Sequence, residues 1–173
     1  MAGRKMGKEM SVMELVDNEI SLVDWAKLKC GCSASAAHLP ANLYRFFRAQ
    51  TREEALNTGI TEHVFTQYFP HEPAPSVASV LMAGLASDIP LAARVESLDL
   101  LLGLVDNEDA DVSDACVDIA REGLWGLYAE VVANRSPALV AYAYQILQVI
   151  DPGERLHALK ASGKLSLPSH LRD

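Results

Sequence analysis

Prolines divide this chain into segments that each have the spacing of an amphipathic helix. Pro40, Pro90 and Pro137 stand where helices can begin, because proline is tolerated in the first turn but breaks a helix interior. The stretch FPHEPAPS at 69–76 has three prolines in six positions, which excludes both a helix and a central strand there. Between these breaks, apolar residues recur with helical periodicity. Helices are predicted over 11–29, from Pro40, from Thr51 toward Phe69, and over 75–86, 90–105, 111–133, 137–150 and 153–161.

The composition agrees with a helical fold. Apolar residues make up 50% of the 173 residues, but aromatic residues make up only 6%. A β-sandwich would need more β-branched and aromatic side chains, so this balance favours helices packed on helices. The length fits one domain with a sizeable core. We therefore expect one all-α domain over residues 1–173, without a convincing strand, with a flexible start at 1–10 and a polar tail at 162–173.

Two stretches near the ends of predicted helices are alike: LLGLVD at 101–106 and ILQVID at 146–151, offset by 45 residues. Each follows a proline-started helix and ends in an aspartate before a break. Together with AAR at 92–94, this pattern resembles the HEAT-like α-helical repeat proteins of bacteria, whose units are antiparallel helix pairs. The resemblance implies a short right-handed α-solenoid of about three pairs, capped by the first helix. The pairs would be 38–69, 75–106 and 111–151; a non-repetitive helical bundle is the alternative.

The net charge of −8 is concentrated in one part of the chain. Residues 88–122 contain ten acids and two bases, which gives −8, and the other residues contain 13 of each and sum to zero. Nucleic-acid binding is disfavoured, because the neutralisation of phosphates needs positive charge. A basic protein partner is favoured instead.

The acids are densest in VDNEDADVSD at 105–114 and continue along the helix that follows. On a helical wheel, the acids after residue 110 lie opposite the apolar side chains, and Trp125 falls among them. An aromatic residue ringed by charge is a typical binding hot spot, although a solvated helix face with a covered tryptophan explains the pattern as well. The candidate partner-binding residues are Asp106, Glu108, Asp109, Asp111, Asp114, Asp118, Glu122 and Trp125.

Two other interpretations of this stretch fit less well. A calcium-binding EF-hand loop that starts at Asp109 would need glycine where Asp114 stands and glutamate where Ala120 stands. A catalytic carboxylate pair in 106–118 would need burial or close contact, which acids on the wet side of a helix do not have. Recognisable nucleophile, zinc-protease and phosphate-loop motifs are also missing from the sequence.

The three cysteines, Cys30, Cys32 and Cys116, are too few and too scattered for a disulfide framework and indicate reduced thiols. Cys30 and Cys32 with His38 invite comparison with a zinc site, but structural zinc needs four ligands and no second ligand pair is apparent. We therefore expect no metal site or cofactor, with Cys30 and Cys32 flanking a turn and Cys116 in the core. The pairs Glu62-His63 and His71-Glu72 are interpreted as surface residues.

These patterns predict a non-catalytic, cytoplasmic binding protein, because the first residues have no apolar signal region and no apolar run is long enough for a membrane. Its expected partner is a basic protein that it masks, as an immunity protein or antitoxin masks a toxin domain. We expect a monomer or weak dimer that binds neither nucleic acid nor membrane. The alternatives are a scaffold or assembly factor built on HEAT-like repeats, and an enzyme that uses carboxylates in 106–118.

Overall fold

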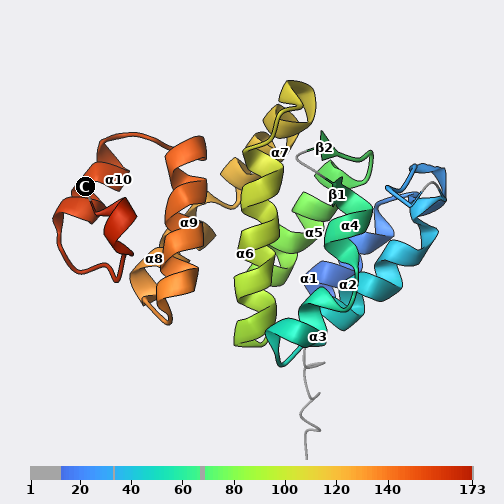
Figure 1. Ribbon diagram of the computed structural model, residues 1–173, viewed down its shortest axis with the longest axis horizontal. Helices are drawn as coiled ribbons and strands as arrows, with labels where there is room; N and C mark the ends of the chain where they lie inside the picture. The colour runs from blue at the N-terminus through green and yellow to red at the C-terminus, as the bar shows by residue number, and fades with distance from the viewer. Residues whose placement is uncertain (1–12, 33, 67–68, 173) are drawn as a thin grey trace, which may run out of the picture.

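The computed structural model describes residues 13–32, 34–66 and 69–172, and it is mostly helical, as predicted (Figure 1). The α-helices are α1 (Glu14–Ser21), α2 (Leu39–Arg48), α3 (Arg52–Leu56), α4 (Ile60–Val64), α5 (Ala74–Leu85), α6 (Leu91–Val105), α7 (Ala110–Glu122), α8 (Leu124–Ala133), α9 (Pro137–Ile150) and α10 (Glu154–Ala161). The short 3-10 helices are η1 (Trp25–Lys27), η2 (Ala36–His38) and η3 (Ser169–Leu171). The expected flexible start at 1–10 lies outside the described residues.

Several helices begin where the sequence indicates. Ser136 caps α9 by accepting a hydrogen bond from the Leu139 amide at 3.2 Å, and Pro137 occupies the first turn. Thr51 and Glu54 form a capping box at the start of α3. These contacts satisfy backbone amides that have no partner within their own helix.

Three predicted helices are shorter in the structure than in the prediction. The helix expected over 11–29 ends at Ser21 and is followed by η1, and the one expected from Thr51 toward Phe69 is divided into α3 and α4. Gly59 separates these two with a φ of 69°, a left-handed conformation that glycine adopts at little cost. The helix expected over 111–133 ends at Glu122, and α8 follows after Gly123.

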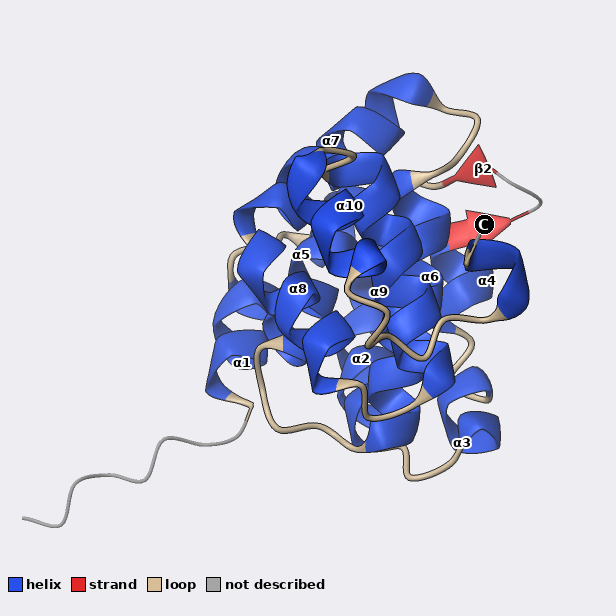
Figure 2. Ribbon diagram, turned by 90° about the vertical axis from the view of Figure 1, so that its left-hand side faces the viewer, coloured by secondary structure: helices blue, strands red, loops and turns tan. Residues whose placement is uncertain are grey.

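The chain also contains a small sheet that was not predicted. Strand β1 (Phe65–Thr66) pairs antiparallel with β2 (Phe69–Pro70) directly after α4. Figure 2 shows this hairpin at one edge of the otherwise helical molecule. Residues 69–73 of the proline-rich stretch lie outside any helix, and Pro70 occupies the end of a strand that is only two residues long. The stretch 69–76 is not free of helix to its end, because α5 begins at Ala74 with Pro75 in its first turn.

The helices are arranged along the longest axis of the molecule. In Figure 1, α8 and α9 lie toward one end, α6 lies in the middle, and α1 and α2 lie toward the other end. Helix α6 packs against α5 and α9, and α5 also packs against α1 and α7. The buried apolar side chains of the described residues form one contiguous cluster, which agrees with a single core.

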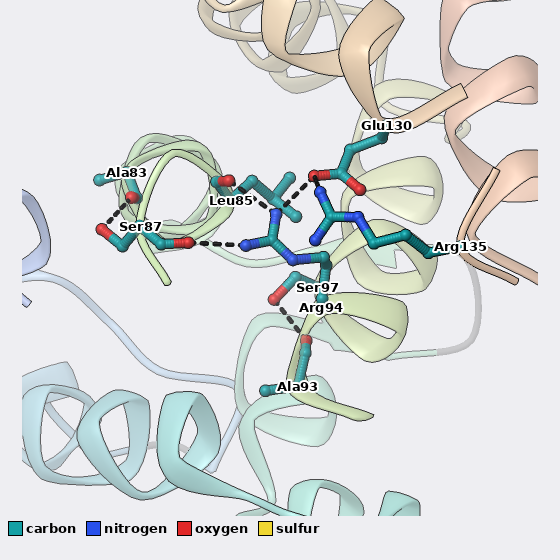
Figure 3. A network of polar contacts seen from close by, with 8 residues as sticks. All are labelled: Ala83, Leu85, Ser87, Ala93, Arg94, Ser97, Glu130 and Arg135. Atoms are coloured by element: carbon teal, nitrogen blue, oxygen red, sulfur yellow. Dashed lines mark hydrogen bonds and ion pairs between the residues drawn. The ribbon is translucent and has the colours of Figure 1, made fainter. Parts of the chain in front are cut away.

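A buried ion pair links the middle of the molecule to α8 (Figure 3). Arg94 of α6 donates to a carboxylate oxygen of Glu130 and to the backbone carbonyls of Leu85 and Ser87 at the end of α5. Arg135 donates to the same Glu130 oxygen at 3.2 Å. The Arg94 and Glu130 side chains are both 5% exposed, so the removal of Glu130 would leave the buried Arg94 charge without its anionic partner.

The last residues are not simply a polar tail. Leu167 is 3% exposed and belongs to the core, and Arg172 donates to its carbonyl at 2.6 Å. The amide of Ser166 also donates to the Asn134 side chain at 3.3 Å. Among the described residues, each helix is too short or too polar to cross a membrane.

Candidate functional site

The acids predicted to bind a partner form one exposed surface, which we call the acidic face. It runs from the loop between α6 and α7 along the outer side of α7, where Arg121 is the one base in the same stretch. Its members, all exposed, are Asp106, Glu108, Asp109, Asp111, Asp114, Asp118 and Glu122. The opposite side of α7 buries Cys116, Val117 and Ala120, so the predicted division of this helix into wet and dry sides is confirmed.

Two members of the acidic face also have local structural roles. Asp109 caps α7 by accepting a hydrogen bond from the Val112 amide at 3.2 Å. Asp118 forms an ion pair with Arg121 at 3.2 Å, with side chains 77% and 53% exposed. An exposed pair of this kind contributes little to stability, about 0–1 kcal/mol. The remaining carboxylates of the face are open to solvent, so a catalytic pair in 106–118 lacks the burial that it would need.

Trp125 is exposed, as a binding residue must be. It lies on α8 and not on α7, and its side chain is 68% exposed, so the alternative of a covered tryptophan is wrong. Gly123 separates the two helices, and an added Cβ there would lie 2.1 Å from the end of Met82 on α5. A wheel drawn through residues 111–133 therefore crosses a helix boundary before it reaches Trp125.

Trp125 packs beside Tyr128 of its own helix and under Arg155 of α10. The Arg155 guanidinium lies 4.8 Å from the centroid of the indole ring, in cation–π contact, and forms an ion pair with Asp151 at 2.8 Å. Tyr128 donates a hydrogen bond to the same Asp151 at 2.8 Å, and burial together with this bond raises the pKa of Tyr128 to about 12. The side chains around the shallow groove, which we call the Trp125 groove, are Trp125, Tyr128, Ala129, Val132, Arg155 and Leu159.

A second group of chemically active side chains lies in the N-terminal half. Cys30, Cys32, His38 and His63 each offer one metal-ligating atom, and the four atoms lie within 4.8 Å of one another. The Cys30 sulfur lies 3.1 Å from His63 Nδ1 and 3.7 Å from His38 Nε2. The two imidazole centroids are 4.4 Å apart, with the rings edge to face. We call these four residues the Cys/His cluster.

Backbone hydrogen bonds fix the loop that carries the two cysteines. The Cys30 amide donates to the Ala34 carbonyl at 2.8 Å, and the Ala36 amide donates to the Leu28 carbonyl at 2.9 Å. These bonds fold the loop back on itself, so that η2 presents His38 beside Cys30. The sequence expectation that the two cysteines flank a turn is confirmed.

Gly31, between the two cysteines, allows this loop to approach α4 closely. Its amide donates to the His63 carbonyl at 2.9 Å. An added Cβ would lie 2.9 Å from the Glu62 backbone oxygen and 2.5 Å from the His71 ring, which is too close for both. A glycine at this position is therefore needed for the loop to reach the helix that carries His63.

Burial changes the acid–base behaviour of the cluster. It raises the pKa of the Cys30 thiol, and together with the nearby His38 it lowers the pKa of His63. A hydrogen bond with the Ala34 backbone lowers the pKa of the exposed Cys32 thiol. The shift at His63 favours a neutral imidazole, which is the form that binds metals.

Three of these four residues stand close together in the sequence, and the fourth does not. His63 was interpreted as a surface residue, but it is half-buried and faces Cys30. Its partner Glu62 is exposed, as expected. Because His63 follows Cys32 by 31 positions and belongs to no motif, only the packing of α4 against the loop reveals it. Cys116 lies in the core of α7, as expected, where burial raises its pKa to about 12.

Comparisons with known proteins do not identify the chain: no family model, curated protein or solved structure matches it.

Proposed function

We propose that this protein is a non-catalytic binding protein that masks a basic partner protein. The observation that carries the proposal is the exposure of all seven carboxylates of the acidic face on one helix and its preceding loop. Seven acids and one base within 106–122 give this surface a charge of −6. Such a field attracts a positive surface, speeds its association and disfavours acidic partners.

Burial does not reduce the charge of the wider 88–122 segment. Its buried members are Glu96, which pairs with Arg52, and Arg94, which pairs with Glu130. Without these two, nine acids and one base remain, and their sum is still −8. The most specific form of the proposal is an immunity protein or antitoxin, because a toxin domain that handles nucleic acid or nucleotides has a positive active site.

We interpret the helices as three HEAT-like antiparallel pairs: α2 with α4, α5 with α6, and α7 and α8 together with α9. The packing of α6 against both α5 and α9 supports this interpretation, as does the arrangement of the helices along one axis (Figure 1). In such a solenoid each pair contacts its neighbours, and the array presents an extended surface suited to binding proteins.

The Trp125 groove is the apolar part of the proposed interface. Trp125 lies three positions after Glu122, the last member of the acidic face. Two large apolar side chains of the groove, Trp125 and Val132, are 68% and 63% exposed. Tryptophan is enriched at binding hot spots, where its removal costs about 2 kcal/mol or more. We therefore expect Trp125→Ala to raise the dissociation rate, and Asp114→Lys with Asp118→Lys to lower the association rate.

The test is photo-crosslinking from defined positions in cells that express the protein. A photoreactive phenylalanine analogue replaces Asp114 or Ala129, both exposed, and a control variant carries it at the exposed Arg45 on α2. We expect one basic protein to be captured from positions 114 and 129 but not from 45. When the crosslinking is repeated in lysate, capture should weaken as salt is raised, because screening acts over about 8 Å at physiological ionic strength. Capture of an acidic protein, or of the same partner equally from all three positions, would contradict the proposal.

A further inference from the structure

We propose that Cys30, Cys32, His38 and His63 bind one structural Zn²⁺ ion. Two thiolates and two imidazoles are a donor set that zinc takes in closed, four-coordinate sites. The two thiolate charges balance the charge of the ion, so that the complex adds no net charge to a partly buried place. Because all four positions are protein ligands, no site is left for a substrate or a catalytic water.

The distances fit a tetrahedral ion. With zinc–sulfur bonds of about 2.3 Å and zinc–nitrogen bonds of about 2.0–2.1 Å, a sulfur and a nitrogen ligand are about 3.6 Å apart. The Cys30 sulfur lies 3.7 Å from His38 Nε2 and 3.1 Å from His63 Nδ1. The four ligating atoms all lie within 4.8 Å of one another, so each pair is near the spacing of ligands around one ion.

The surroundings of His38 prepare it as a ligand. Its Nδ1 lies 3.1 Å from the Ser35 carbonyl, which can accept a hydrogen bond but cannot donate one. This contact holds the proton on Nδ1 and leaves the Nε2 lone pair free, and Nε2 is the atom that faces Cys30. Metal-binding histidines typically have such a partner on the other ring nitrogen.

The position of the cluster explains what the ion would do. The four residues come from the loop after η1, from η2 and from α4, and the Gly31–His63 backbone bond joins the loop to α4. Helices of three to five residues are not stable by themselves. One ion would link these segments and stabilise the fold around α4, because metal binding adds to the free energy of folding.

Two variants separate loss of zinc from loss of fold. Cys32 is exposed, so Cys32→Ser removes a ligand and little packing. Cys116→Ser is its control, since it makes the same replacement in the core, outside the cluster. His63→Gln and His71→Gln form a second pair: His71 lies beside the same loop, but its Nε2 contacts the Thr66 hydroxyl at 2.9 Å.

The experiment measures metal content and affinity of the full-length chain purified without chelators. We expect about one zinc per chain by mass spectrometry of the metal in the wild type, Cys116→Ser and His71→Gln. Cys32→Ser and His63→Gln should bind zinc about 100-fold more weakly or worse in competition with a chromophoric chelator, since even partners outside the ligand set matter 10–100-fold. Co²⁺ in place of zinc should give the intense visible absorption of tetrahedral thiolate coordination only in the wild type, Cys116→Ser and His71→Gln.

Three results would overturn the proposal. The first is a wild-type protein that takes up no zinc at micromolar free metal and gives Co²⁺ only a weak, octahedral spectrum. The second is equal zinc content and affinity in all five proteins, which would place the ion elsewhere. The third is stoichiometric iron or copper in place of zinc after growth with all three metals.

Discussion

Two regions of this molecule are held together by different means. Helices α5, α6 and α9 are 12–15 residues long and bury leucine, valine and alanine side chains against one another. The described residues of 25–38 and 60–71, which we call the metal-site region, contain 3-10 turns, the five-residue α4 and a two-stranded hairpin. In the first region, length and apolar contact stabilise the helices. In the second, stability depends on links between segments, such as the Gly31–His63 backbone bond and the Cys/His cluster.

The largest effect is expected in the long-helix region, at the buried ion pair of Figure 3. Glu130→Leu leaves the Arg94 guanidinium in the core without its anionic partner, and we expect a loss of about 3–5 kcal/mol in the free energy of unfolding. The double variant Arg94→Met with Glu130→Leu should lose less than Glu130→Leu alone, because no unpaired charge remains. Urea denaturation followed by circular dichroism measures both, and a double variant less stable than the single one would show that the pair itself is strongly stabilising.

A smaller effect is expected when glycine is changed to alanine. The free energy of unfolding should fall for the change at Gly31 and rise for the change at Gly126. Gly31→Ala should destabilise by about 1–3 kcal/mol and weaken zinc binding, because its Cβ would meet the Glu62 carbonyl and the His71 ring.

The matched substitution is Gly126→Ala, at the third residue of α8. An added Cβ at this exposed position has no atom within 4 Å. Alanine should stabilise the helix by about 0.5–1 kcal/mol. Thermal unfolding of the two variants compares them directly. If both substitutions shift the melting temperature in the same direction, the close approach of the loop to α4 is not the constraint described.

The smallest effect is expected on the acidic face. Replacing Asp111, Asp114 and Asp118 with Asn removes like-charge repulsion of a few tenths of a kcal/mol per pair and loses the exposed Asp118–Arg121 ion pair. We expect the stability to stay within about 0.5 kcal/mol of the wild type. A urea midpoint lowered by much more than this would mean that the carboxylates have structural partners. Zinc content should be unchanged in this variant, since α7 carries no residue of the Cys/His cluster.

The same contrast explains what could be predicted from the sequence. The long helices follow from apolar periodicity and from Pro90 and Pro137, which act locally, and the exposure of Asp111, Asp114 and Asp118 follows from the same periodicity. The helix breaks at Gly59 and Gly123 were missed, because an isolated glycine is tolerated inside a helix and only its surroundings decide the outcome.

The complete Cys/His cluster could not be predicted from the spacing of residues in the sequence, for a related reason. Cys30, Cys32 and His38 lie within nine positions and were noticed, but three donors do not make a structural zinc site. The fourth, His63, is brought to them by the packing of α4 on the loop, which no spacing rule encodes. Trp125 shows the same limit, because a wheel continued from α7 passes the boundary at Gly123 before it reaches α8.

Hydrogen exchange with and without a zinc chelator tests the contrast most directly. The account predicts that chelation, checked by metal analysis, speeds amide exchange about tenfold or more in the metal-site region and leaves α5, α6 and α9 unchanged. Cys32→Ser should show the fast pattern in the metal-site region without any chelator, whereas Cys116→Ser should show a change in that region only after chelation. Exchange that stays the same after complete removal of zinc, or that rises equally in α5, α6 and α9, would contradict the claim that a metal stabilises the region of short elements.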